Sequence, residues 1–150
     1  MTANRLADQA QDTDQGSEPY PIVHLDPRLV YEGAVQHGAK LGRTIGFPTA
    51  NVAVPRPGPE RGIYAARVRL ADGSLCEAIA YFGSRPTVDG VGDLLEAYLF
   101  DFDGFLYGSE LRVELVAFIR PDEQFAGLDE MVTQMRRDCV RARAVLRGEI

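Results

Sequence analysis

Short β-type segments separated by tight turns constrain the fold of this chain more than any other feature. Residues 63–70 (IYAARVRL) and 75–82 (LCEAIAYF) carry aromatic and β-branched side chains and flank the turn sequence ADGS at 71–74. An Asp-Gly pair between two such segments is typical of a β-hairpin. Two further segments, 94–102 and 110–119, are separated by another Asp-Gly pair. The pattern predicts an antiparallel sheet.

The segment 94–102 (LLEAYLFDF) is apolar on both of its faces. In a strand, side chains alternate between the two faces, so one face carries Leu95, Ala97 and Leu99, and the other carries Tyr98, Phe100 and Phe102. A strand that is buried on both sides fits a small barrel whose interior is filled by one face while a helix covers the other. The earlier segment 29–35 (LVYEGAV) is predicted to be the first strand.

The C-terminal region has a different period. Apolar residues recur there at three- and four-residue steps, at Leu128, Met131, Val132, Met135, Cys139, Ala142 and Leu146. This spacing predicts an amphipathic helix that begins after Gly127, a residue that tolerates the N-cap position. The fold class is therefore a β-rich α+β domain, a small antiparallel barrel with a docked C-terminal helix. An open sheet with the helix across it is the alternative. Glycine- and proline-rich stretches at 38–48, 55–59 and 83–93 are predicted loops.

Composition narrows the function. The chain has 150 residues, 45% hydrophobic and 25% charged, with a formal net charge of -6. A negative protein is a poor partner for DNA or RNA, because phosphate neutralisation needs a basic face. No apolar run approaches the ~20 residues of a membrane span, and no secretory signal is visible, so we expect a cytoplasmic protein without a membrane partner. Residues 1–24 are expected to be a disordered, acidic and polar tail and 25–150 one domain, a monomer rather than an oligomer.

One loop has the composition of an anion-binding segment. Gly38, Gly42 and Gly46 are spaced by four residues and are interleaved with Lys40 and Arg43. Glycines let the backbone approach a ligand closely and turn its N–H groups toward an anion. The pattern GxxxxGK[ST] is absent, which excludes a P-loop NTPase. On spacing alone, an ordinary turn-rich connection is favoured slightly over an anion-binding loop.

Oxygen-bearing side chains follow this loop. Thr49 and Asn51 are two residues apart in an extended segment, so both point to the same side. Hydroxyl and amide oxygens are ligands that Mg²⁺ accepts beside phosphate oxygens. Glu96 is a carboxylate on an otherwise apolar strand, where it must be paired, exposed at the strand end, or functional. A functional Glu96 could accept a proton from a substrate hydroxyl.

The segment 119–125 (IRPDEQF) joins the last strand to the helix. A cation and an aromatic ring on one loop can stack on a planar ligand. The alternative is a plain connection in which Phe125 fills a gap in the core.

Together these motifs resemble the riboflavin kinase family. GRTIGFPTAN (42–51) is followed in order by GIYAARVRL, GSRPT, LLEAYLFDFDGFLYG and IRPDEQF, and the resemblance covers about residues 29–147. It implies a six-stranded antiparallel, Greek-key-like β-barrel with a C-terminal helix. It also implies transfer of the ATP γ-phosphoryl group to the ribityl 5′-hydroxyl of riboflavin, giving FMN and ADP.

The resemblance also implies the roles of single residues. Glu96 would be the catalytic carboxylate, and Thr49 and Asn51 would bind Mg²⁺ or another divalent cation together with the ATP phosphates. The remaining ATP contacts would be Gly38, Arg43, Leu99, Asp101 and Tyr107. The flavin contacts would be Arg120, Glu123 and Phe125. Tyr98 and Glu123 differ from the histidine and lysine that are common there in the family.

In many bacteria such a kinase domain follows an FMN adenylyltransferase domain with an HxGH motif. This sequence has no HxGH motif and only 28 residues before Leu29, so we expect it to make FMN and not to adenylylate it. A non-catalytic sensor of flavin or nucleotide is the alternative from another class. A kinase for another small alcohol on the same scaffold is a third.

Overall fold

The computed structural model describes residues 20–36, 49–87 and 89–150, and it contains one antiparallel sheet and one long helix. The elements are β2 (Val23–Ala34), β3 (Thr49–Pro55), β4 (Gly62–Arg69), β5 (Leu75–Pro86), β6 (Gly92–Leu99), β7 (Glu110–Pro121) and α2 (Leu128–Leu146). The strand order is β2-β7-β4-β5-β6-β3, with every neighbouring pair antiparallel. The predicted β-rich α+β class is confirmed.

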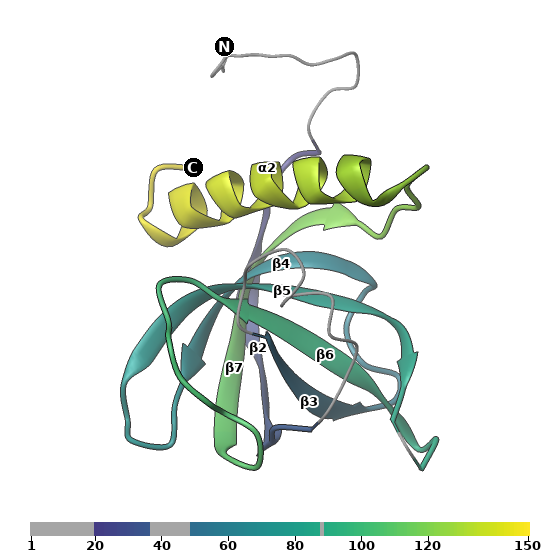
Figure 1. Ribbon diagram of the computed structural model, residues 1–150. Helices are drawn as coiled ribbons and strands as arrows, with labels where there is room; N and C mark the ends of the chain where they lie inside the picture. The colour runs from purple at the N-terminus through teal and green to yellow at the C-terminus, as the bar shows by residue number, and fades with distance from the viewer. Residues whose placement is uncertain (1–19, 37–48, 88) are drawn as a thin grey trace.

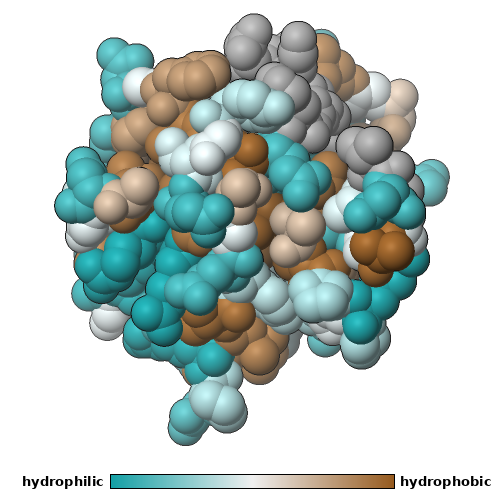
Figure 2. All heavy atoms as spheres, turned by 90° about the horizontal axis from the view of Figure 1, so that it is seen from below, coloured by the Kyte–Doolittle hydropathy of each residue, from teal (hydrophilic) through white to brown (hydrophobic). Residues whose placement is uncertain are grey.

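The sheet curls into a half-barrel (Figure 1). Its two edge strands approach each other where the backbone N–H of Gln36, just after β2, donates to the carbonyl of Asn51 on β3 at 2.8 Å. Alternate side chains of all six strands fill the interior, among them Val52, Tyr64 and Leu95. On the side of the molecule away from α2, hydrophobic residues are set among hydrophilic ones (Figure 2). The described part of the fold thus has one interior core and an outer sheet face that the helix can cover.

Helix α2 lies across the outer face of the sheet over β4 and β5 (Figure 1). The second apolar cluster lies between them and includes Ile63, Ile79, Tyr98 and, from the helix, Cys139. The two predicted faces of β6 are confirmed for five residues: Leu95, Ala97 and Leu99 face the interior, and Tyr98 and Phe100 face the helix.

Phe102 was predicted on the helix side and instead packs against the interior cluster. The reason is that β6 ends at Leu99, and Asp101 then adopts a positive φ of 55°. The left-handed backbone at Asp101 interrupts the extended conformation, so the two-residue alternation no longer holds.

The predicted helix is confirmed, since it spans Leu128–Leu146 with Gly127 at its N-cap. Asp129 and Glu130 occupy its first turn, where the positive end of the helix dipole favours acidic side chains. No helix among residues 20–36, 49–87 and 89–150 is long and apolar enough to cross a membrane.

Two predicted boundaries were wrong. The first strand was expected at 29–35 but begins at Val23, with an irregular register between His24 and Leu29. The stretch 83–93 was expected to be a loop, but β5 continues to Pro86 and β6 begins at Gly92. Glycine and proline can occupy strand positions when the backbone around them pairs with a neighbouring strand. Composition alone does not show which segments pair in this way. The predicted glycine-rich loop and most of the predicted tail lie outside the described residues.

Candidate functional site

The pairing of β3 with β6 brings the predicted oxygen ligands next to the predicted carboxylate. In this register Asn51 is the direct partner of Glu96, and Thr49 is the partner of Tyr98. The Cα atoms of such antiparallel partners are about 4.5–5.5 Å apart, and their side chains leave the sheet on the same side. Asn51 is 4% exposed and Glu96 is 0% exposed. The sheet therefore brings Thr49 and Asn51 next to Glu96, from a distant part of the sequence, on its outer face.

Asn51 has a hydrogen-bonding capacity that the described residues do not use. Its Oδ1 atom is buried and has no hydrogen-bond donor among the residues that the structure describes. Leaving a buried acceptor without a donor costs about 1–3 kcal/mol, so such atoms are rare and call for a ligand or a partner. An amide oxygen beside a carboxylate is a donor set that suits a hard cation such as Mg²⁺. The residues present therefore fit a divalent metal.

The Asn51–Glu96 pair is one end of a row of side chains that crosses five strands. Glu96 on β6 is the partner of Tyr81 on β5, and Tyr81 is the partner of Ile63 on β4. Ile63 is in turn the partner of Arg120 on β7. We call these five residues the outer-face row. It connects the strand with the PTAN sequence to the strand that leads into the helix.

Arg120, at the other end of the outer-face row, is 4% exposed and is bound internally. Its Nε donates to both carboxylate oxygens of Asp138 at 2.9 and 3.0 Å, and its Nη2 donates to Oδ2 at 2.8 Å. Asp138 on α2 is fully buried, and its Oδ1 also accepts from Gln134 at 3.0 Å. This bidentate pair fastens the helix to β7. The predicted role of Arg120 in flavin binding stays a prediction, since the described contacts of its guanidinium lie within the protein.

The other two predicted flavin contacts are beside Arg120. Glu123 Oε1 is 3.6 Å from Arg120 Nη1, and the ring centroid of Phe125 is 5.7 Å from the guanidinium carbon. Phe125 also lines a surface cavity of about 420 Å³ against the first turns of α2. The other lining residues are Asp129, Glu130, Thr133, Gln134 and Arg137. Phe125 is the single aromatic side chain in a lining that is otherwise polar or charged.

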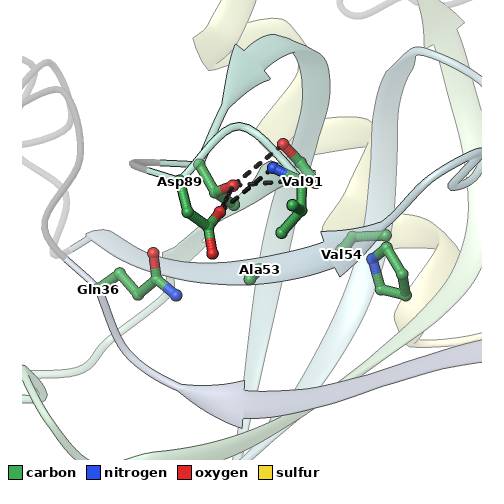
Figure 3. A pocket seen from close by; sticks show the side chains of 8 residues that line it. Gln36, Ala53, Val54, Asp89 and Val91 are labelled. Atoms are coloured by element: carbon green, nitrogen blue, oxygen red, sulfur yellow. Dashed lines mark hydrogen bonds between the residues drawn. The ribbon is translucent and has the colours of Figure 1, made fainter.

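A second cavity, of about 390 Å³, lies beside the edge strand β3 (Figure 3). The turn with Asp89 and Val91 faces Ala53 and Val54 of β3 across it, and Gln36 lies at one end. The side chain of Thr87 donates to Asp89 at 2.6 Å, which holds the pKa of the Asp89 carboxyl below its usual value. The carboxylate at this rim is therefore ionised at neutral pH.

Arg56 holds the wall of this second cavity in place. Its guanidinium donates to both carboxylate oxygens of Asp93 at 3.2 and 3.3 Å. It also donates to the carbonyl oxygens of Gly90 at 2.7 Å and of Gly92 at 3.3 Å. One side chain thus fixes the turn between β5 and β6 to the end of β3. Sequence reasoning did not find Arg56, because nothing in a Pro-rich turn shows which loop it contacts.

The predicted ATP contacts among the described residues differ in exposure. Leu99 is fully buried in the interior core. Asp101 is exposed and lies 3.2 Å from Arg143 on the helix. Tyr107 is 48% exposed, and its ring is 6.3 Å from that of Phe105. Gly38 and Arg43 lie outside the described residues. Among the described residues, no group of three or more His, Cys, Asp or Glu side chains could hold a metal ion by itself.

Known proteins resemble the chain over this same domain. The family described as riboflavin kinase, or flavokinase, matches residues 25–146. A protein named bifunctional riboflavin kinase/FMN adenylyltransferase from Haemophilus influenzae is 44% identical over 113 residues, which cover 75% of this chain and 37% of that protein. The protein of the same name from Escherichia coli K12 is 45% identical over 112 residues, covering 74% and 36%. The one from Bacillus subtilis is 35% identical over 121 residues, covering 77% and 38%.

A solved structure agrees with the fold. A protein of Streptococcus pneumoniae, described as a macrolide-efflux protein, superimposes with a TM-score of 0.67 at 34% identity and covers 77% of this chain and 38% of that one. The chain belongs to the riboflavin kinase family, since the family match covers most of its length. It spans little more than a third of the length of the relatives that it matches.

Proposed function

We propose that this chain phosphorylates riboflavin at the ribityl 5′-hydroxyl with ATP, giving FMN and ADP. The observation that carries the proposal is the direct pairing of Asn51 with Glu96 on the buried outer face, within a member of the riboflavin kinase family. A phosphotransferase needs an oxygen ligand for a metal–phosphate complex and a proton acceptor beside it, and this pair offers both. The family membership selects riboflavin as the alcohol.

In the proposed reaction, the oxygen of the 5′-hydroxyl forms a bond to the γ-phosphorus while the bond from that phosphorus to ADP breaks. Glu96 orients the hydroxyl and receives its proton. The transition state of phosphoryl transfer is loose, so most of the rate enhancement comes from holding the two substrates in line. A carboxylate on a strand that is paired on both sides is suited to this task, because the sheet fixes its position.

Thr49 and Asn51 would hold a divalent cation, which supplies positive charge that neutralises the transferring phosphates. The glycine-rich loop with Gly38 and Arg43 would add backbone N–H groups and a cation. Leu99, at the end of β6, and Asp101 and Tyr107, in the segment that follows, would contact ATP. Leu99 can do so only through its backbone, since its side chain fills the core.

The flavin half of the site is assigned to the loop between β7 and α2. Phe125 lines the cavity of about 420 Å³ and could stack on the flavin ring. Glu123 is exposed and could meet a polar edge of the ring, whereas Arg120 would act through its hold on this loop. A monomeric, cytoplasmic domain over residues 25–150 is part of the same proposal.

The test is incubation of the protein with riboflavin, ATP and Mg²⁺, followed by chromatographic detection of FMN. We expect FMN and ADP in equal amounts. Saturable riboflavin binding without FMN would instead indicate a flavin sensor. Phosphorylation of another small alcohol in place of riboflavin would indicate a different kinase.

A further inference from the structure

Tyr81 is the one member of the outer-face row that links Glu96 to the loop between β7 and α2. Its backbone pairs with that of Glu96, so the two side chains leave the sheet side by side. Its hydroxyl donates to Asp122 Oδ2 at 3.1 Å, 41 residues further along the chain. The Tyr81 side chain thus runs from the catalytic carboxylate of the proposed site to the first residue after β7.

Asp122 also binds the backbone of the loop that follows it. Its second oxygen, Oδ1, accepts the backbone N–H of Glu123 at 2.9 Å. One carboxylate therefore joins the Tyr81 hydroxyl to the backbone that carries Glu123 and, two residues later, Phe125. On its other side the same loop is held by Arg120, which lies 3.6 Å from the Glu123 carboxylate.

The sequence makes room for this arrangement at Gly83. A Cβ atom at that position would be 2.2 Å from the Tyr81 hydroxyl oxygen and 2.5 Å from the ring carbon that bears it. Contacts below 3.0 Å are not tolerated, so any residue other than glycine would displace the phenol. Glycine at 83 is thus required for Tyr81 to lie over the strand and reach Asp122.

We propose that Tyr81 is a positioning residue of the proposed transfer site. Through Asp122, Tyr81 fixes the position of the loop between β7 and α2, where the flavin ring is proposed to bind, relative to Glu96. It thereby determines where the ribityl hydroxyl lies relative to the Glu96 carboxylate. The inference rests on the proposed function. It does not require Tyr81 to touch either substrate.

The test is Tyr81→Phe, which removes the hydroxyl and keeps the ring packed against the second apolar cluster. We expect the KM for riboflavin to rise about three- to tenfold, the effect of one lost hydrogen bond to a carboxylate at a partly exposed site. The KM for ATP should stay within twofold. Riboflavin binding measured by quenching of flavin fluorescence should weaken by the same factor, without any turnover. A packing role alone would move none of these values.

Asp122→Ala should produce the same change, and the double variant should be no worse than either single variant, because the two groups act through one contact. The matched control is Tyr31→Phe, a partly buried tyrosine on β2 that packs against the interior core. If the wild type forms FMN but Tyr81→Phe leaves the riboflavin KM within twofold, or raises both KM values equally, the inference is wrong. A wild type that forms no FMN would overturn the proposed function itself, and the inference with it.

Discussion

Two buried polar pairs lie at opposite ends of the outer-face row, and they differ in how their hydrogen bonds are used. At one end, Arg120 and Asp138 bind each other through three contacts of 2.8–3.0 Å, and Gln134 adds a fourth to the carboxylate. At the other end, the Oδ1 atom of Asn51, beside Glu96, has no donor among the described residues. A pair whose groups satisfy each other stabilises the fold. A buried acceptor without a donor among the described residues carries a cost of about 1–3 kcal/mol, which a ligand or another partner can offset.

The largest expected effect breaks the satisfied pair. Asp138→Ala leaves the Arg120 guanidinium buried without its carboxylate, and such an unpaired buried charge costs about 3–5 kcal/mol of folding free energy. Urea unfolding of the two proteins measures the difference. The control is Glu149→Ala, which removes the exposed pair of Arg147 and Glu149 at 3.9 Å and should cost less than about 1 kcal/mol. Equal costs for the two variants would show that burial of the pair does not matter.

The next effect falls on chemistry at the other end of the row. Glu96→Gln keeps the shape of the side chain but removes the proton acceptor, so turnover should fall by ~10² or more. ATP binding should stay nearly intact, because the phosphates are assigned to other groups. Initial rates of FMN formation and ATP affinity are the measurements. Glu114→Gln, on the exposed pair with Arg28, is the control and should keep its turnover. Near-normal turnover of Glu96→Gln would remove Glu96 from the mechanism.

The two ends also differ in how well the sequence predicted them. The fold class, the helix at 128–146 and both faces of β6 up to Phe100 follow from the periods of apolar residues, since these periods directly reflect burial. Glu96 was singled out because a carboxylate on an apolar strand is an exception to the pattern, and Asn51 because it shares one side of an extended segment with Thr49. The chemistry assigned to both residues stays a prediction.

Pairing between distant segments could not be predicted. Arg120 was assigned to the flavin from its place in a loop motif, whereas its described contacts are with Asp138, a residue that the helical pattern treats as one more polar position. Tyr81 was part of a predicted strand, but its neighbour Glu96 depends on the register between β5 and β6. Register is set by three-dimensional packing and turn geometry, and a single sequence shows it only weakly.

A smaller effect is expected for Asn51→Ala, which should change the dependence on Mg·ATP and not the free energy of unfolding. Asn51→Ala removes an acceptor that bonds to no described residue, so the free energy of unfolding should change by less than about 1 kcal/mol. The half-saturating concentration of Mg·ATP should rise about tenfold, the effect of losing one ligand to a charged group. Steady-state kinetics at varied Mg·ATP and urea unfolding test the two halves. A large loss of stability with unchanged Mg·ATP dependence would place Asn51 with Arg120 and Asp138 as a structural group.

The smallest effect is expected at Arg56, which resembles Arg120 in its hydrogen bonds but differs from it in exposure. Like Arg120, it makes several hydrogen bonds, with two contacts to Asp93 and one each to the carbonyls of Gly90 and Gly92. Unlike Arg120, its side chain is 50% exposed, so water can replace the lost contacts. Arg56→Ala should therefore lower the free energy of unfolding by less than about 1 kcal/mol.

What Arg56→Ala should change is local. The turn between β5 and β6 loses its attachment to β3, so hydrogen exchange at the amides of Gly90, Val91 and Gly92 should become faster while the amides of β4 keep their protection. Arg28→Ala is the matched control, because Arg28 is also about half exposed and pairs with one carboxylate at 3.3 Å. It should leave exchange in this turn unchanged. The contrary result would be that Arg56→Ala lowers the free energy of unfolding as much as Asp138→Ala does. Burial of a polar contact would then not determine whether its loss affects the whole domain or only one turn.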